Sequence, residues 1–413
     1  MNIIYVSSFP PQRCGIASYT WSLARSIAQL HPSCKPSIIS FKTVEPDLMR
    51  HVDDGIEVYR LLRKGVRASY LSSSQLINRL KVDVVHLQHE FGLFGGRHGS
   101  AILPFIENIK RPLLVTFHSV KRASAGIKRI VARISEKAGK IIVHSRYAAS
   151  ALHTRFKVPE EKIRVVPHGV PFIDLMKIDR VRLRRRLGLE DRLVIANFGL
   201  MSPRKGLEYA IKAMKLVAKE IPQALFLILG ATHPNIIRKE RERYRESLQE
   251  LTSSLKLDAN VRLVNKFMDE DELLGYLIAS DIYLIPYPNR NQVSSGTLSY
   301  ALSCGKAVIS TPFHYAVELL GSVKERLNGG ISICQRGIIV PPKNPVSISK
   351  AVILLAEDAK LRSSLESESY SYALKNMMWP NVAGMHLQLY GSMLKDYEDS
   401  SGLDLQVSLR QGI

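Results

Sequence analysis

The stretch "DIYLIPYPNRNQVSSGTLSYALSCGKAVISTP", residues 281–312, decides the fold of the chain. Its two ends are short apolar runs that lack the polar alternation of a half-exposed strand, so both are predicted to be strands buried on two faces. Between them, small hydroxyl residues open a helix that Gly305 can close in a left-handed conformation. A buried strand, a helix and a second buried strand in succession predict a parallel α/β sheet.

The same alternation extends over the whole chain. Further strand-like runs are "NIIYVSS", "KPSIISF", "IEVYRL", "DVVHLQ", "PLLVTFH", "KIIVHS" and "IRVVPHG" in the first half, and "RLVIANFG", "ALFLILGA", "VRLVN" and "GIIVPP" in the second. Because 413 residues exceed what one core usually fills, we expect two consecutive doubly wound, Rossmann-like domains. The predicted parts are a first domain, a second domain, C-terminal helices that pack back toward the first domain, and a loose tail: 1–175, 176–375, 376–398 and 399–413.

Composition excludes several classes of protein. No apolar stretch approaches the roughly 20 residues of a membrane span, and "MNIIYVSSFPP" has no basic region before its apolar run, so we expect a cytoplasmic, soluble or peripheral protein. The four cysteines are scattered, which predicts neither a disulfide framework nor a zinc site. The 58 Lys and Arg against 37 Asp and Glu give a net charge of +21 and favour a polyanionic partner, such as a phosphorylated substrate, anionic lipid or nucleic acid.

Two turns in the second half are suited to binding an anion. In "NFGLMSPRKGLEYAIKAM", Ser202 is predicted to cap a helix whose first turn carries Arg204 and Lys205. Cations there oppose the helix dipole, which indicates an anion to be met, although a solvated surface helix is the alternative. The second turn is the helix start at residues 294–297, whose N–H groups point outward over a glycine. Together they predict one diphosphate site, and no acidic pair nearby indicates a bound Mg²⁺.

In the first half, polar residues follow the predicted strands. Gly15 precedes a helix in "FPPQRCGIASYTWSLARSI", and His118 ends the strand "LLVTFHSV", where structural and catalytic roles are both open. "DVVHLQHEFGLFGG" places His86, His89 and Glu90 at a neighbouring edge. The two histidines would point to opposite faces of a strand, which argues against a shared metal.

In their order along the chain, these motifs resemble the retaining glycosyltransferases of family 4. The resemblance rests on the glycine loop at 13–16, "VTFH", "VVPHGV", "SPRKGLEYAI", "LILGATHP", "ASDIYLIPY" and "SSGTLSYALSCGKAVISTP", and so covers nearly the whole chain. It implies the GT-B fold, with two Rossmann-like domains facing across a cleft. It also implies transfer of a hexose from a UDP- or GDP-sugar to a glycan or lipid-linked acceptor, without a metal or other cofactor.

The resemblance also assigns roles to residues. Lys205 and the N–H groups near 295–297 would hold the diphosphate, and His118 would lie beside the donor sugar. The implied catalytic residues are His118, Lys205 and Gln292. The implied donor-binding residues are Gly15, Arg204, Lys205, Lys266, Phe267, Met268, Ser294, Ser295, Gly296, Thr297 and Tyr300, and the acceptor-binding residues are Arg13, His89 and Glu90.

Two departures from the family pattern concern this site. The paired glutamates of the family fall on Gln292 and Tyr300, and the arginine that usually precedes the lysine has no match at Gly199 or Leu200. Replacing a charged by a neutral hydrogen bond costs on the order of tenfold in rate, so Gln292 is compatible with activity. Tyr300 leaves the nucleotide preference open, because the second glutamate ordinarily meets the ribose hydroxyls.

Basic segments leave further alternatives. The stretch "KRASAGIKRIVARISEKAGK", residues 121–140, has apolar residues at helical spacing and predicts either a helix docked on anionic lipid or a core-packed helix with a solvated outer face. "RVRLRRRLGL", residues 180–189, is expected to be a solvated helical face. A sugar phosphorylase, a nucleotide-sugar epimerase, a non-catalytic partner of another transferase and a basic nucleic-acid-binding protein are the competing functions. No aromatic-interleaved basic strand supports the last, so we expect no nucleic-acid partner.

Overall fold

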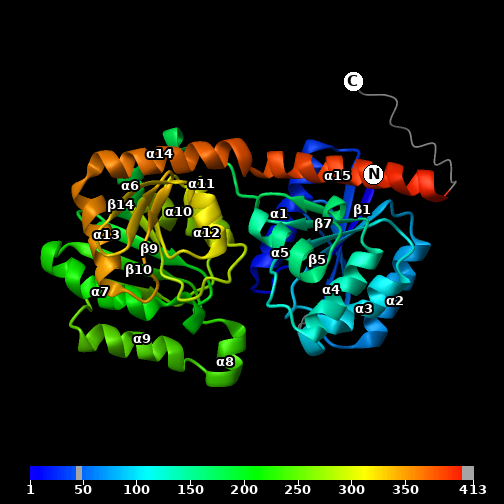
Figure 1. The fold of residues 1–413 in the computed structure, drawn as a ribbon, viewed down its shortest axis with the longest axis horizontal. Coiled ribbons are helices and arrows are strands. Elements are labelled where there is room, and N and C mark those ends of the chain that lie inside the picture. Colours follow the sequence, from blue (N-terminus) through cyan, green and yellow to red (C-terminus); the bar gives the residue numbers. More distant parts are fainter. Residues whose placement is uncertain (43–48, 402–413) are drawn as a thin grey trace. The chain divides into compact units, whose positions relative to one another are not determined.

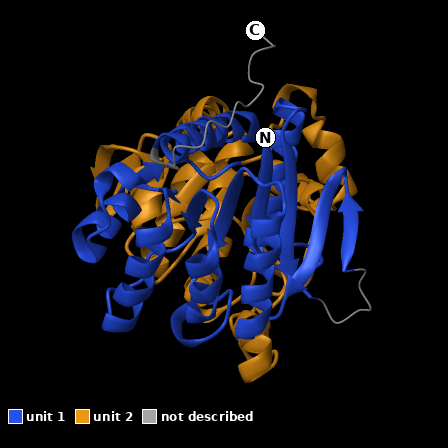
Figure 2. Cartoon of the chain, turned by 90° about the vertical axis from the view of Figure 1, so that its right-hand side faces the viewer, with its two compact units in different colours: residues 1–169, 379–413 blue, residues 170–378 orange. Residues whose placement is uncertain are grey.

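The structure, a computed structural model, describes residues 1–42 and 49–401 and divides into two compact units. The first unit comprises residues 1–169 together with the C-terminal segment from Trp379, and the second comprises residues 170–378 (Figure 2). Each unit is a sheet of eight strands with helices packed on it (Figure 1). No helix in the described ranges combines the length and the hydropathy that crossing a membrane requires.

The sheet of the first unit has the strand order β3-β4-β2-β1-β5-β6-β7-β8. All neighbours are parallel except β3 and β4, which are antiparallel. The strands are β1 (Asn2–Val6), β2 (Lys35–Phe41), β3 (Arg50–Asp53), β4 (Ile56–Leu62), β5 (Val84–His89), β6 (Leu113–Phe117), β7 (Lys140–Val143) and β8 (Ile163–Val165). The helices are α1 (Gly15–Leu30), α2 (Arg67–Arg79), α3 (Leu103–Asn108), α4 (Ala125–Lys137), α5 (Arg146–Phe156) and α15 (Trp379–Ser401), with 3₁₀ turns η1 (Arg97–Ile102) and η2 (Glu160–Lys162).

The C-terminal helix α15 completes the core of this unit. It packs against α1, and Val382 and Tyr390 are fully buried in one cluster with Tyr5 of β1. A Cβ atom at Gly169 would lie 2.2 Å from the indole ring of Trp379, the first residue of α15. Only glycine therefore fits at residue 169. The helix continues to Ser401, and the rest of the predicted tail, residues 402–413, lies outside the described residues.

The basic helix α4 is packed into the core of its unit. Its apolar stripe, Ile127, Ile130, Val131 and Ile134, is at most 5% exposed. Ser124 caps the helix by accepting a hydrogen bond from the N–H of Ile127. The apolar face is therefore occupied by the core, which is the second of the two alternatives that the sequence leaves for this segment.

The sheet of the second unit has the order β11-β10-β9-β12-β13-β16-β15-β14. Its strands are β9 (Leu193–Phe198), β10 (Ala224–Leu229), β11 (Val261–Val264), β12 (Ile282–Ile285), β13 (Ala307–Ser310), β14 (Val323–Leu327), β15 (Ile331–Cys334) and β16 (Gly337–Ile339). Its helices are α6 (Arg180–Arg186), α7 (Leu207–Glu220), α8 (Pro234–Glu240), α9 (Arg243–Ser254), α10 (Glu270–Ala279), α11 (Gly296–Ser303), α12 (His314–Leu320), α13 (Pro345–Glu357) and α14 (Ala359–Asn376), with 3₁₀ turns η3 (Leu175–Lys177) and η4 (Pro203–Lys205).

The central strands of this sheet are buried on both faces, as the opening stretch predicts. Neighbouring residues of β9, Ile195 and Ala196, belong to two different hydrophobic clusters because alternate side chains of a strand point to opposite faces. The same holds for Tyr283 and Leu284 of β12. At one end of the sheet, β15 pairs antiparallel with both β16 and the edge strand β14, an arrangement that the sequence pattern does not predict.

The two units divide after Gly169, whereas the sequence places the joint after residue 175. The N–H of Val170 donates to the carbonyl of Met377 at 2.9 Å, and Val170 pairs with Met378. Farther along, the hydroxyl of Tyr370 donates to the carbonyl of Ile173. These contacts attach the segment after Gly169 to α14 of the second unit, although its sequence lacks the pattern of a regular element.

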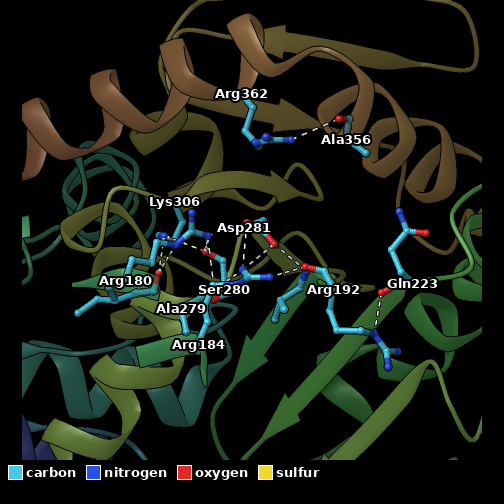
Figure 3. Close-up of polar contacts among 12 residues, drawn as sticks. Arg180, Arg184, Arg192, Gln223, Ala279, Ser280, Asp281, Lys306, Ala356 and Arg362 are labelled. Carbon is cyan, nitrogen blue, oxygen red and sulfur yellow. Dashed lines mark hydrogen bonds and ion pairs between the residues drawn. The ribbon is translucent and has the colours of Figure 1, made fainter. Parts of the chain in front are cut away.

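The arginine-rich helix α6 is expected from the sequence to be a solvated face, and the structure departs from this at Arg184, whose side chain is only 16% exposed. Arg180 Nε and Arg184 Nη1 donate to the carbonyls of Ile278 and Ala279 at the C-terminal end of α10, at 3.1 and 2.8 Å. Both guanidinium groups also bind the carboxylate of Asp281 (Figure 3). The last carbonyls of a helix have no partner within it, so both arginines complete α10, although Arg180 stays exposed.

Candidate active site

Lys205 lies at the centre of a polar cluster in the second unit. Its Nζ is 2.6 Å from the phenolic oxygen of Tyr287 and 4.8 Å from the centre of that ring. The same phenolic oxygen is 3.4 Å from Oγ1 of Thr297 in the first turn of α11. The turn after β9, the end of β12 and the start of α11 therefore meet at one point, where Tyr287 bridges the two turns that the sequence predicts to bind the diphosphate.

Tyr287 is a member of this cluster that the sequence analysis missed. Burial alone would raise the pKa of its phenol, but the Lys205 ammonium and hydrogen bonds from Lys205, Thr297 and Ser295 outweigh burial and lower the pKa. The phenol is thus held in a strongly positive, hydrogen-bonding environment. Its position at the end of the strand "DIYLIPY" was the available signal.

Gly199 explains one departure from the family pattern. Its φ is +119°, and a Cβ atom there would lie 3.1 Å from Lys205 Nζ and 3.3 Å from Cγ2 of Thr297. A side chain at this position would crowd Lys205 Nζ and Thr297, and a φ of +119° is one that residues other than glycine rarely adopt. The backbone conformation is therefore the physical reason for glycine instead of arginine at residue 199.

The turn that carries Arg204 and Lys205 differs from the prediction. Residues 203–205 form the 3₁₀ turn η4, Gly206 is left-handed with φ of 65°, and α7 begins only at Leu207. Ser202 makes no capping hydrogen bond. The two cations therefore precede the helix instead of lying in its first turn, and the argument from the helix dipole does not apply to them.

Both cations nevertheless lie near a neighbouring histidine. The pKa of His233 is lowered by burial and then by the positive charges of Arg204 and Lys205. Arg204 is exposed and Lys205 is half-buried. The end of the sheet near β9 and β10 is thus positively charged.

The predicted start of α11 is as expected. Ser295 caps the helix by accepting from the N–H of Leu298 at 3.3 Å, and its Oγ is 3.1 Å from Oγ1 of Thr297. The exposed side chain of Gln292 donates to the carbonyl of Ser294 at 3.0 Å. The loop from Gln292 to Thr297 is therefore held by its own side chains in front of the helix.

Tyr300 binds a carboxylate that the sequence analysis did not single out. Its hydroxyl donates to Oε1 of Glu270, the first residue of α10. Burial and the Glu270 charge raise the pKa of Tyr300 well above its usual value, so the phenol stays protonated. Tyr300 thus places an exposed carboxylate beside the site at which the family has one of its own.

The other predicted donor residues near α10 separate into two groups. Lys266 is exposed and binds Glu272 at 2.6 Å, and Phe267 is 38% exposed. Met268 instead packs against the hydrophobic core of the unit, so it is less accessible to a ligand than its two predecessors.

In the first unit, His118 follows β6 and is held by β5. Its Nε2 is 2.7 Å from Oε1 of Gln88, and its backbone N–H donates to the carbonyl of His89 at 3.0 Å. Burial and then His144 and His168 lower its pKa well below the usual value, so His118 is a neutral imidazole at physiological pH.

The rings around His118 form a cluster that the sequence analysis missed. Tyr19 of α1 lies with its ring centre 4.9 Å from that of His118, 5.4 Å from that of His144 and 5.1 Å from that of His168. His144 directly follows β7 in "KIIVHS", and His168 lies three residues after β8 in "VVPHGV", which was the available signal. Among the described residues, no group of three or more His, Cys, Asp or Glu side chains is placed to hold a metal ion.

The predicted acceptor residues differ in accessibility. His89 is fully buried, its ring packs against Phe91, Phe94 and Phe117, and neither of its ring nitrogens has a hydrogen-bond partner. Burial lowers its pKa to about 3. His89 is thus enclosed by the core of its unit and offers no side-chain atom to an acceptor in solvent, in contrast to the predicted contact.

Gly15 and Arg13, by contrast, are exposed. A Cβ atom at Gly15 would meet no atom within 4 Å, and its backbone is not left-handed. Nothing inside the unit therefore requires glycine at this position. A glycine at an exposed helix start allows a ligand to approach the backbone closely, which is a physical reason for the absence of a side chain at residue 15.

Two family models cover most of the chain. The model described as "Glycosyltransferase Family 4" matches residues 14–172, and the one described as "Glycosyl transferases group 1" matches residues 179–372. The chain belongs to glycosyltransferase family 4. The predicted family, enzyme class and GT-B type of α/β fold are thereby confirmed.

Known relatives of this glycosyltransferase are distant but cover its full length. The "GDP-mannose-dependent alpha-(1-6)-phosphatidylinositol monomannoside mannosyltransferase" of Mycolicibacterium smegmatis is 24% identical over 91% of this chain and 94% of its own. Among solved structures, a glycosyltransferase from Rickettsia africae has a TM-score of 0.76 at 19% identity, covering 96% of this chain and 99% of its own. Anabaena HepE in complex with UDP has a TM-score of 0.72 at 17% identity, covering 95% and 100%.

Proposed function

We propose that this glycosyltransferase transfers a hexose from a UDP- or GDP-sugar to a glycan or lipid-linked acceptor, with retention of anomeric configuration and without a metal ion. The observation that carries the proposal is the Lys205 ammonium held against the phenol of Tyr287, whose oxygen is 3.4 Å from Thr297 Oγ1 at the start of α11. A lysine beside exposed helix N–H groups suits the charge that develops on a departing diphosphate.

The donor diphosphate would lie between η4 and α11. Lys205, Arg204 and the N–H groups of Gly296 and Thr297 supply positive charge and donors, and Ser294 and Ser295 shape the loop. The stretch from 286 to 306 contains no Asp or Glu that could hold a divalent cation. Stabilisation by lysine and N–H groups therefore takes the place of a metal in this proposal.

The nucleoside would extend toward the start of α10. A ribose offers two neighbouring hydroxyl groups, for which a carboxylate is a strong hydrogen-bond acceptor. Glu270, held by the hydroxyl of Tyr300, supplies that acceptor in place of the glutamate missing from residue 300. Lys266 and Phe267 are the accessible residues for contact with the base.

Each unit carries residues that we propose for contact with the sugar or the acceptor. Gln292 provides both a donor and an acceptor for a sugar hydroxyl. In the first unit, neutral His118, the open backbone at Gly15, and Arg13 and Glu90 are the proposed contacts. The acceptor hydroxyl would attack from the face that the diphosphate leaves, and a leaving phosphate oxygen would take its proton.

A lipid-linked acceptor is supported by one relative and by charge. The mycobacterial relative is named for a phosphatidylinositol acceptor, and the net charge of +21 favours an anionic surface. Since the apolar stripe of α4 is buried, we propose that any peripheral contact with the inner face of a membrane is electrostatic, through its basic outer residues.

The test is a donor screen followed by product analysis. A site-specific ligand at 100 times its dissociation constant stabilises a fold by about 2.7 kcal/mol, so thermal shifts with UDP-, GDP- and ADP-hexoses identify the nucleotide. Incubation with the stabilising donor, with and without acceptor glycans and glycolipids, should give an α-linked product from an α-linked donor and free nucleoside diphosphate. Epimerised donor, or sugar phosphate formed with inorganic phosphate, would contradict transfer and favour the competing enzymes.

A further inference from the structure

A chain of buried hydrogen bonds runs from His118 into the core of the first unit. His118 Nε2 is 2.7 Å from Oε1 of Gln88, and Nε2 of the same amide is 3.2 Å from Nε2 of His86. An amide oxygen can only accept and an amide nitrogen can only donate. With Oε1 facing His118 and Nε2 facing His86, His118 therefore donates to Gln88, and Gln88 donates to His86.

The chain continues from His86 to the C-terminal helix α15. Nε2 of His86 also accepts from Oγ1 of Thr116 at 2.8 Å, so the proton of this neutral imidazole resides on Nδ1. Nδ1 then donates to the hydroxyl of Tyr390 at 2.7 Å, which is 3.1 Å from the hydroxyl of Tyr5. His86, Gln88, Thr116 and Tyr390 are all fully buried.

We propose that Gln88 is a positioning residue that holds His118 as the Nε2–H tautomer of a neutral imidazole, and that Tyr390 and His86 hold the Gln88 amide in the orientation that does so. This inference rests on the proposed function, in which His118 lies beside the donor sugar. Reversing the amide would require the proton of each imidazole to change nitrogen, so the bonds of the chain are coupled.

The choice of an amide over a carboxylate matters at this position. Besides Gln88, described groups that face His118 include Tyr19 of α1, His86 and His89 of β5, His144 after β7 and His168 after β8. Burial and then the four histidines lower the pKa of His118, and burial and the positive charge of Lys121 lower that of His89. A carboxylate at residue 88 would act in the opposite sense and stabilise the imidazolium of His118 directly.

The first test is the isosteric substitution Gln88→Glu, with Gln88→Met as the uncharged comparison. The introduced carboxylate should raise the pKa of His118 by about one to three units, which moves the acidic limb of the kcat/KM profile toward neutral pH by a similar amount. Gln88→Met should lower kcat/KM without moving that limb. If the acidic limb of the kcat/KM profile of Gln88→Glu lay at the same pH as in the wild type, the inference would be overturned. A purely structural role of Gln88 would lower the rate without altering the pH profile.

The second test reads the tautomer directly, without substrate. In the full-length protein with ¹⁵N-labelled histidine, His118 is identified by the signals lost in His118→Gln, and its nitrogen shifts should report protonated Nε2 and unprotonated Nδ1. Tyr390→Phe removes the acceptor of the His86 proton and should convert His118 to a mixture of tautomers. Tyr5→Phe, at the far end of the chain, should leave the tautomer unchanged.

The two readouts separate failure of the inference from failure of the proposed function. An unchanged His118 tautomer in Tyr390→Phe and in Gln88→Met would overturn the positioning role whatever the activity. Full transfer activity in His118→Gln would instead overturn the proposed role of His118 in the reaction. Nitrogen shifts as predicted would still support the hydrogen-bond chain in that case.

Discussion

The two ends of the sheet in the second unit both carry clustered cations, yet the cations have different partners. Where β12 and β13 begin, Lys306 Nζ donates to the carbonyls of Ser280 and Ile278 at 2.9 and 3.2 Å. Arg180 and Arg184 bind the same turn and the carboxylate of Asp281 (Figure 3). These acceptors are the last carbonyls of α10 and the residue that follows them, so the protein itself supplies the negative partners.

At the opposite end, where β9 and β12 finish, the protein supplies fewer acceptors for its cations. Lys205 contacts a phenol, and Arg204 is exposed. Equal side-chain chemistry therefore has different consequences: cations that already have carboxylate or carbonyl acceptors are engaged within the fold, and cations that lack them are suited to an anionic ligand. Four substitutions test this difference between the two ends of the sheet.

The largest effect is expected for Lys205→Ala. Loss of the ammonium that faces the departing diphosphate should lower kcat by about 10²- to 10³-fold, which is typical of removing one preorganised charge-stabilising donor. The free energy of unfolding should change by less than about 0.5 kcal/mol. Steady-state kinetics and denaturant unfolding measure the two quantities.

The control is Lys212→Ala, an exposed lysine on α7 of the same unit, which should change neither quantity. If Lys205→Ala retained wild-type kcat, the assignment of the donor site to this end of the sheet would be wrong.

The second prediction is a loss of stability with little loss of activity, the opposite of the result expected for Lys205→Ala. Asp281→Ala removes the carboxylate that accepts from Arg180 at 2.6 Å and from the N–H of Val194 at 2.7 Å. Breaking a largely buried ion pair from one side should lower the free energy of unfolding by about 3 kcal/mol. Below its denaturation temperature, the variant should keep kcat within a factor of about three.

A stable but inactive Asp281→Ala protein would contradict the division between the two ends. Asp258→Ala, at an exposed position of the same unit, provides the control for a general effect of charge removal.

The third prediction concerns pH. Burial lowers the pKa of Lys306 from 10.5 to about 8, so between these values the unfolded chain binds a proton that the folded protein does not. Stability should therefore rise with pH over this window because of Lys306, at up to about 1.36 kcal/mol per unit. Tyrosines also titrate near pH 10 and affect both proteins alike. The free energy of unfolding of Lys306→Met is therefore subtracted from that of the wild type at each pH, and the difference should increase from pH 8 to 10.

A flat difference would show that Lys306 keeps its ordinary pKa and that its carbonyl partners fully compensate for burial. The matched comparison is Lys350→Met on α13, where the lysine is exposed and no slope is expected.

The smallest effect is expected for Glu270→Gln. The amide can still accept from Tyr300 and from a ribose hydroxyl, but it loses the charge that strengthens both bonds. KM for the nucleotide sugar should rise about tenfold while kcat changes little, which titration of initial rates against donor concentration would reveal. Glu272→Gln, two residues farther along α10, should not raise KM to the same extent; equal effects of both variants would argue against a specific ribose contact.

Part of this site could be predicted because it follows strand ends. Lys205, Ser295 and Thr297 lie in turns after buried strands, and parallel strands bring their carboxyl ends to one edge. The sequence could not predict that the lysine would meet Tyr287, 82 residues away, because that contact depends on β9 and β12 being neighbours. The sequence likewise could not predict Glu270 as the partner of Tyr300 or Asp281 as the partner of Arg180, because these residues are far apart along the chain and meet only in the folded protein.

The sequence by itself determined the family, the alternation of buried strands and helices, and the residue types at the strand ends. These properties are local: a run of apolar residues sets its own period, and a motif is read along the chain. The surroundings of a polar side chain follow only from the tertiary structure, which encloses His89 among phenylalanines and brings Arg180 and Arg184 to the last carbonyls of α10. Whether a polar side chain is structural or functional depends on which acceptors lie around it in space, and distant parts of the chain supply them.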